Sequence, residues 1–147
     1  MANPIVTNYD PKKVVITFGG VPIQGFADGD FIEIAADDAD GFKKQVGADG
    51  EVARAQSNNN THNVTITLMQ SSLSNPYLSN IRNTDKLLGK SCLPLSITDI
   101  NGGSLHFWPQ AWIKGDPTWG YGKELKERQW TFDTGQQATD NKSGLLP

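Results

Sequence analysis

One segment of the chain alternates apolar and polar residues without a break. Every second residue of Asn63–Leu68 (NVTITL) is apolar, beginning at Val64, and the residues between them are Asn or Thr. A repeat of two is the side-chain period of a β-strand, in which neighbouring residues point to opposite faces of the sheet. The segment therefore predicts a half-buried strand, and with it a sheet that has a core on one side only.

Other short segments have the composition of strands and are separated by turn residues. The chain is rich in β-branched and aromatic residues, and its 15 Gly and 8 Pro divide it into short pieces, as at Gly19-Gly20 and Asn101-Gly102-Gly103. We therefore predict a mainly β fold. The expected strands are Lys13–Phe18, Val21–Phe26, Phe31–Ile34, Phe42–Val46, Glu51–Ala55, Asn63–Leu68, Leu95–Ile100, Ser104–Trp108, Gln110–Lys114 and Glu127–Phe132, the last with Trp130 and Phe132 on one face.

A single helix is expected between the strands. It begins at Ser74 or Asn75, has Pro76 in its first turn and continues towards Leu88. Its apolar stripe is short, because the residues spaced four apart are Leu73, Tyr77, Ile81 and Asp85. Such a helix can lie on a sheet but cannot form a core of its own.

Length, charge and cysteine content restrict the class of protein. The 147 residues fit one domain, and we expect residues 134–147 to form a weakly structured tail. The formal charge of −3 argues against a protein that grips nucleic acid. We expect the one cysteine, Cys92, to be buried, and its isolation excludes an internal disulfide. With no apolar segment of membrane-spanning length and no signal-like N-terminus, we expect a soluble protein without a membrane anchor.

Three motifs hint at chemistry, and each has a simpler explanation. Phe132-Asp133-Thr134-Gly135 matches the signature of aspartic proteases, but we assign Asp133 to a turn that ends a strand. Ala36–Gly47 resembles a calcium loop but lacks the carboxylates at its first and last positions, so a solvated loop is expected. His62 and His106 have no neighbours that suggest zinc or a nucleophile, and we expect them on the surface or in a sheet. We predict no catalytic residue, cofactor or metal.

The four tryptophans allow two interpretations. Trp108, Trp112, Trp119 and Trp130 could together form a sugar-binding platform, as in a lectin-like module. Most of them lie in or beside predicted strands. Packing in the core or at a subunit interface is therefore the favoured interpretation.

Several dispersed segments resemble the tail tube proteins of contractile-tailed bacteriophages. The resemblance lies in Ser71–Asn75 before the helix, in Leu95–Gly103 (LSITDINGG), in Ala111-Trp112-Ile113 and in Tyr121–Phe132, which ends in RQWTF. It spans nearly the whole chain and consists of packing and turn residues. It implies a two-sheet β barrel or sandwich with one flanking helix, similar to the tube subunit of type VI secretion.

The resemblance also implies a structural function. Proteins of this kind form hexameric rings that stack into a hollow tube inside a contractile sheath, through which DNA is ejected. The implied partners are copies of the same chain and the sheath, tape-measure, baseplate and tail-terminator proteins, and DNA passes through without specific binding. The implied location is the virion tail, with assembly in the cytoplasm of the bacterial host. The alternatives are a tube initiator of the baseplate, a secretion-system tube protein, a dimeric hydrolase using Asp133, or a lectin-like module.

Two sets of charged residues are candidates for assembly contacts. The segment from Asp37 to Ala55 carries little apolar surface, so we expect it to connect stacked rings. Its candidate contact residues are Asp37, Asp38, Asp40, Lys43, Lys44 and Asp49. The lumen should be acidic because fixed negative charge repels DNA, and the candidates there are Glu33 and Glu51, which lie in predicted strands.

Overall fold

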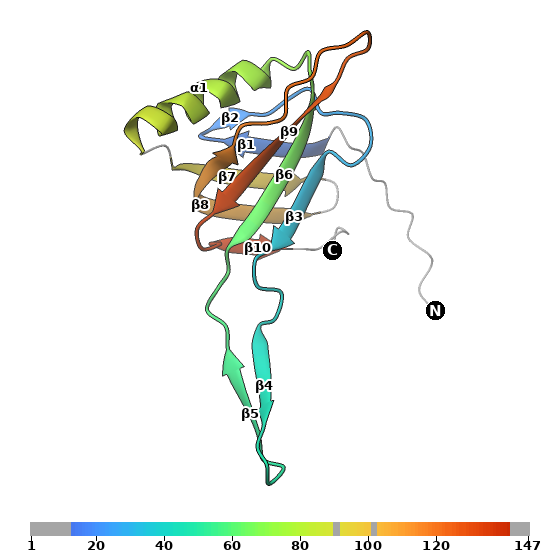
Figure 1. Cartoon of the computed structure of the whole chain (residues 1–147). Helices are drawn as coiled ribbons and strands as arrows, with labels where there is room; N and C mark the ends of the chain where they lie inside the picture. The colour runs from blue at the N-terminus through green and yellow to red at the C-terminus, as the bar shows by residue number, and fades with distance from the viewer. Residues whose placement is uncertain (1–12, 90–91, 101–102, 142–147) are drawn as a thin grey trace, which may run out of the picture.

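The computed structural model describes residues 13–89, 92–100 and 103–141. Nearly half of them belong to β-strands, so the fold is mainly β as the sequence predicts, and one α-helix crosses the top of the sheet in Figure 1. The elements are β1 (Val14–Phe18), β2 (Val21–Pro22), β3 (Ile32–Ala36), β4 (Phe42–Val46), β5 (Val52–Gln56), β6 (His62–Met69), α1 (Ser74–Leu88), β7 (Leu93–Asp99), β8 (Ser104–Gly115), β9 (Glu127–Thr134) and β10 (Thr139–Asn141).

The main sheet folds over on itself to form a sandwich. Its strands follow the order β2-β1-β7-β8-β9-β6-β3, with β10 paired to β8. Strand β8 belongs to both halves, because it pairs with β7 along most of its length and with β9 from Ala111 to Gly115. In Figure 1 the strands β1, β7 and β8 run across the strands β9, β6 and β3. The edge strands β2 and β3 are not paired with each other, so the two-sheet prediction is confirmed as a sandwich and not as a closed barrel.

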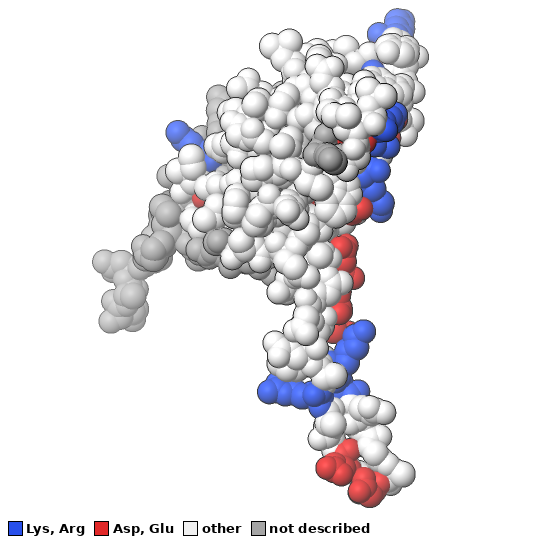
Figure 2. All heavy atoms as spheres, turned by 90° about the vertical axis from the view of Figure 1, so that its left-hand side faces the viewer, with Lys and Arg blue, Asp and Glu red and all other residues white. Residues whose placement is uncertain are grey.

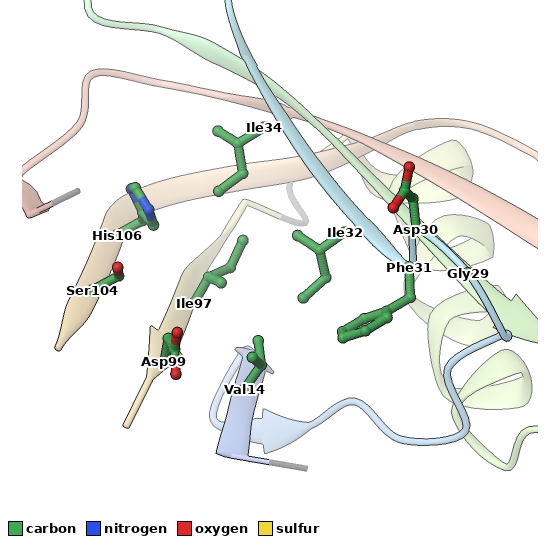
Figure 3. A pocket seen from close by; sticks show the side chains of 10 residues that line it. All are labelled: Val14, Gly29, Asp30, Phe31, Ile32, Ile34, Ile97, Asp99, Ser104 and His106. Atoms are coloured by element: carbon green, nitrogen blue, oxygen red, sulfur yellow. The ribbon is translucent and has the colours of Figure 1, made fainter. Parts of the chain in front are cut away.

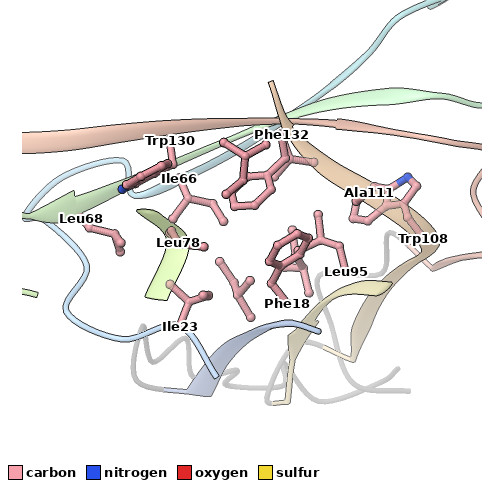
Figure 4. Packing of buried hydrophobic residues seen from close by; sticks show 14 residues of the cluster. Phe18, Ile23, Ile66, Leu68, Leu78, Leu95, Trp108, Ala111, Trp130 and Phe132 are labelled. Atoms are coloured by element: carbon pink, nitrogen blue, oxygen red, sulfur yellow. The ribbon is translucent and has the colours of Figure 1, made fainter. Parts of the chain in front are cut away.

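The core fills the space between the two halves. The inward residues of β6 are Val64, Ile66 and Leu68, all fully buried, and the alternating pattern of the sequence is thus confirmed. From β9, Trp130 and Phe132 point into the same space (Figure 4). The Phe132 ring meets Phe18 of β1 edge to face, at 5.0 Å between centroids.

Strand β8 is longer than the sequence suggests. We expected Pro109 to separate two strands, but β8 runs from Ser104 through it to Gly115. Between Leu93 and Leu95 of β7 the register against β8 shifts, with Leu95 opposite Trp108 and Leu93 opposite Ala111. Proline lacks an N–H group and is tolerated in a strand where a bulge removes the need for that donor. The bulge at Pro109 therefore bends the strand without ending it.

Helix α1 occupies the predicted residues but docks through other side chains. Leu78 is fully buried and Tyr77 is half-buried, whereas 89% of Leu73 is exposed, so the predicted stripe is wrong at its first position. The side chain of Asn75 fixes the start of the helix: it accepts a hydrogen bond from Trp130 Nε1 at 3.0 Å and donates to the carbonyl of Met69. The helix ends at Gly89, whose φ of 64° suits glycine.

Three smaller expectations are corrected. The second strand of the first hairpin is only Val21–Pro22, and Phe26 instead forms an isolated bridge with Leu68. Cys92 is exposed, not buried. Part of the tail expected to be weakly structured forms β10, which pairs with β8 through Thr139, and β9 extends to Thr134. The predicted turn at Asn101-Gly102 lies outside the described residues.

Candidate assembly surfaces

The β4–β5 hairpin projects away from the sandwich (Figure 1). All residues of both strands are exposed, and none of them contributes to the buried core. Phe42 at the base is covered by the Arg54 guanidinium, which lies 4.1 Å from the ring centroid. At the tip, Asp49 accepts a hydrogen bond from the Glu51 N–H, and Gly50 has a φ of 88°. The hairpin therefore holds its shape by local contacts and has a surface free for other molecules.

Hydrogen bonds fix the acidic approach to the hairpin. Asp37 accepts a bond from Thr61 Oγ1 at 2.7 Å, and Asp38 accepts one from Ser57 Oγ at 2.5 Å. The bond from Ser57, followed by the N–H of Asp40, lowers the pKa of Asp38 below its usual value. Figure 2 shows a red acidic strip above a blue basic cluster on the projection. The structure thus orders a charged surface along one side of the projection.

The ring-stacking candidates all lie on this projection or at its base. Lys43 and Lys44 are exposed on β4, and Asp49 is in the turn at the tip. The lumen candidates are separated, because Glu33 lies on β3 while Glu51 precedes β5 and is part of the tip. The expectation that Glu51 lies within a strand is wrong.

The outward face of β3, β6 and β9 is polar and carries acidic charge. Cross-strand pairing places Glu33 beside Thr65, and Thr65 beside Thr131. None of the outward residues of these three strands is Lys or Arg. These residues are Glu33, Ala35, Asn63, Thr65, Thr67, Met69, Glu127, Gln129, Thr131 and Asp133. The adjacent strand β8 adds Lys114 at the border. Few side chains on this face could hold a phosphate.

A polar depression of about 440 Å³ lies on the same face. It is lined by Thr67, Glu127, Gln129 and Thr131, together with residues 116–118 of the β8–β9 connection. Asp116 in that connection accepts a hydrogen bond from Lys86 Nζ at 2.7 Å, which lowers the pKa of the Asp116 carboxyl. Helix α1 is thereby tied to the edge of the depression.

At the end of the sandwich opposite the hairpin, an arginine is buried against aromatic rings. Only 3% of Arg128 is exposed, and its guanidinium carbon lies 4.4 Å from the Trp119 ring centroid and 5.6 Å from that of Tyr121. Both rings belong to the β8–β9 connection, and Tyr121 is 81% exposed. Sequence reasoning missed this site. Arg128 precedes Trp130 by two residues, so the alternation of the strand already places its side chain on the same inward face.

A mostly apolar pocket of about 360 Å³ marks the open side of the sandwich (Figure 3). Ile32 and Phe31 on the β3 side face Val14 of β1 and Ile97 of β7 across it. Asp30, Asp99, Ser104 and His106 complete the lining. Its aliphatic centre is typical of a sandwich whose edge strands do not meet.

The residues considered for catalysis are dispersed. Asp133 is inside β9, not in a turn after it, and accepts a hydrogen bond from Asn63 Nδ2 at 3.3 Å. His62 is buried on β6, where its Nδ1 accepts a hydrogen bond from Trp108 Nε1 at 3.2 Å, so only its placement in a sheet was right. In the described ranges, no group of three or more His, Cys, Asp or Glu residues could hold a metal ion.

The tryptophans do not share a surface. Trp108 and Trp130 are buried in the core, Trp112 is half-buried on β8, and Trp119 lies over Arg128. Packing is confirmed as the role of the two buried rings. Within the part of the chain that the structure describes, no helix is long and apolar enough to cross a bilayer.

Comparison with known proteins places this architecture among contractile systems. The structure matches the tube-terminating cap of the anti-feeding prophage with a TM-score of 0.64 at 10% identity, over 96% of this chain and 97% of the other. It matches the sheath/tube terminator of an extracellular contractile injection system with a TM-score of 0.62 at 11% identity, over 91% and 97%. The fold is one that contractile injection systems use.

Two further similarities agree with this fold. A chain from the sheath-tube complex of the extracellular contractile injection system matches with a TM-score of 0.60 at 11% identity, over 88% of this chain and 89% of the other. In sequence, the chain is 26% identical over 134 residues to structural protein ORF10 of Pseudomonas phage KPP10, covering 86% of this chain and 77% of that protein. No protein-family model matches the chain.

Proposed function

We propose that this protein is a structural subunit of a contractile phage tail and forms its inner tube. The observation that carries the proposal is the likeness in fold to a chain of a sheath-tube complex over 88% of this chain. The sequence similarity to a phage structural protein supports a location in the virion tail. We expect assembly in the host cytoplasm, and hexameric rings as the repeating unit.

The geometry supports different roles for two surfaces, one in ring stacking and one in lining the lumen. The projecting β4–β5 hairpin, with its candidate residues Lys43, Lys44 and Asp49, connects one ring to the next. The outward face of β3, β6 and β9 lines the lumen, and Glu33 contributes to its negative charge. DNA slides along such a wall because it offers repulsion and few cations. The sheath, the tape-measure protein, the baseplate and the tail terminator are the proposed partners.

A tube terminator is the second candidate function. It is favoured by the two structural likenesses with TM-scores of 0.64 and 0.62, both to proteins that terminate tubes. A terminator binds the last ring and stops growth, whereas a tube subunit adds to its own kind without limit. Subunits whose axial contact surfaces stay free at each end continue to polymerise, whereas a subunit that blocks one of these surfaces ends the polymer.

Electron microscopy of the purified protein tests the proposal. A tube subunit forms tubes of uniform width whose length increases with protein concentration. A terminator forms single rings at every concentration and binds the end of a tube made by another protein. A stable monomer or dimer under conditions that favour assembly would contradict both functions.

A further inference from the structure

Arg128 is a buried cation whose charge is not balanced locally. Its Nη1 nitrogen has no hydrogen-bond partner among the described residues, and its guanidinium lies over the rings of Trp119 and Tyr121. Burying a charged group without a hydrogen-bonded counterion is costly. Aromatic faces offset part of that cost but leave the Nη1 donors unused. Arg128 is therefore prepared for a carboxylate.

The two segments beside this site carry exposed apolar side chains. Backbone N–H groups join residues 69–73 to the β8–β9 connection, because Gln70 donates to Lys126 O and Lys126 donates to Gln70 Oε1. Four exposed apolar residues on these two segments form what we call the distal surface: Leu73, Trp119, Tyr121 and Leu125. Apolar groups that gather on a surface and are rimmed by charge are typical of a protein contact.

The opposite end of the molecule offers matching chemistry. Figure 1 shows the hairpin at the far end from the β8–β9 connection, and Figure 2 shows acidic side chains at its tip. The tip carries the carboxylates of Asp49 and Glu51, both exposed. Behind the tip, Val46 and Val52 face each other across the hairpin and are 59% and 62% exposed. The hairpin thus carries acid at its tip and apolar groups behind it, and this complements a buried cation with exposed apolar side chains beside it.

We infer that the distal surface is the receptor for the β4–β5 hairpin of a second copy of this chain, and that Arg128 binds a carboxylate of its tip. The inference rests on the proposed stacking of rings and adds the site that receives the hairpin. The apolar residues behind the tip pack on Trp119 and Leu125. The exposed Tyr121 ring swings aside to admit the carboxylate, because little else holds it.

The energetics favour assembly over free subunits. A carboxylate that reaches Arg128 gains two charge-assisted hydrogen bonds in a partly desolvated place, where each is stronger than on an open surface. Because Arg128 is already buried and lies against the Trp119 ring, only the incoming carboxylate must lose most of its water. The contact is heterologous, so each subunit that adds presents a new free end of the same kind.

Disulfide trapping tests the contact directly. In a Cys92→Ser background, Glu51→Cys and Tyr121→Cys are introduced together, both at exposed positions. Oxidation of assembled protein should give a ladder of covalent oligomers. The matched control pairs Glu51→Cys with Leu87→Cys, which is as exposed as Tyr121 but lies on α1, and should give no ladder. Tubes that form without a ladder in the first pair would overturn the receptor assignment and leave the tube function standing. If the protein forms no stacks, both proposals fall.

A double-mutant cycle tests the role of Arg128. The pair Asp49→Asn and Glu51→Gln should raise the critical concentration for tube growth at least about tenfold. The same pair should have little further effect in an Arg128→Gln background. Glu124→Gln, an exposed acid on the β8–β9 connection, is the control and should change growth little. An equal effect of the tip variants in both backgrounds would show that the tip acids act without Arg128. The disulfide-trapping test uses no arginine variant and so does not depend on how well Arg128→Gln folds.

Discussion

Shortening the β4–β5 hairpin should separate folding from tube growth. Phe42 and Gln56 are paired at the base of the hairpin, so residues 43–55 can be replaced by Asn-Gly, which forms a two-residue turn between paired residues. All the strand residues removed are exposed, and none is in the core. The deletion removes roughly half of the connection between β3 and β6, and closing the shorter loop gains about 0.6 kcal/mol. We therefore expect the free energy of unfolding to change by less than about 1 kcal/mol.

Growth, by contrast, should be lost. The shortened variant should form rings that do not stack, because the proposed axial contact is gone. Urea denaturation followed by tryptophan fluorescence measures the stability, and sedimentation with electron microscopy measures the assembly. A second variant keeps the hairpin but replaces Val46 and Val52 with Thr, which separates the length of the hairpin from its apolar surface. Long tubes of normal width from the shortened variant would refute the role of the hairpin.

Three further predictions concern the helix and the lumen. Asn75→Ala should lower the free energy of unfolding in urea by about 1 to 3 kcal/mol, because it leaves the Trp130 N–H buried without an acceptor. Exposed Asn80→Ala is the control, and an equal loss there would refute this. Asp116→Asn should lower the free energy of unfolding above about pH 5, because the variant loses the ion pair with Lys86. The difference in free energy from the wild type should decline as the pH falls through the lowered pKa of the Asp116 carboxyl. A difference that persists at about pH 2 would contradict the ion pair. Replacing Glu33 and Glu127 with Lys changes the charge by about four per subunit and should slow DNA ejection at low salt, with recovery in added salt. Normal ejection from fully assembled particles at low salt would mean that this face does not line the channel.

Local patterns in the sequence predict the strands whose pairing is simple. The alternation in Asn63–Leu68 predicts both the strand and its buried face, and Pro76 marks the first turn of α1 within its observed bounds. The hairpin from Phe42 is also predictable, because Gly47 and Gly50 bound its turn. These features depend on residues close to one another in the chain.

Features that depend on distant residues are missed or misjudged. Pro109 looks like the end of a strand, but its missing donor is accommodated by a bulge opposite β7. His62 is expected on the surface or in a sheet, and its burial is missed because Trp108 donates a hydrogen bond to it from another strand. The alternation of β9 places Arg128 inward, but the rings that cover it come from the β8–β9 connection and are missed for the same reason. A single sequence carries no record of such pairings.

The acidic face depends both on local sequence patterns and on the pairing of distant segments. The parity of each strand decides which of its residues point outward, so Glu33, Thr65 and Thr131 are each predictable as outward residues. That they form one row is a result of the order β9-β6-β3, which brings together segments about 30 and 65 residues apart. A register slip of one residue in β9 would turn Arg128 outward onto this face and bury Gln129 or Thr131 in its place. The hydrophobic pattern that fixes the register of β9 therefore also keeps a cation off the proposed DNA-facing wall and holds Arg128 inside, at the site we assign to the hairpin.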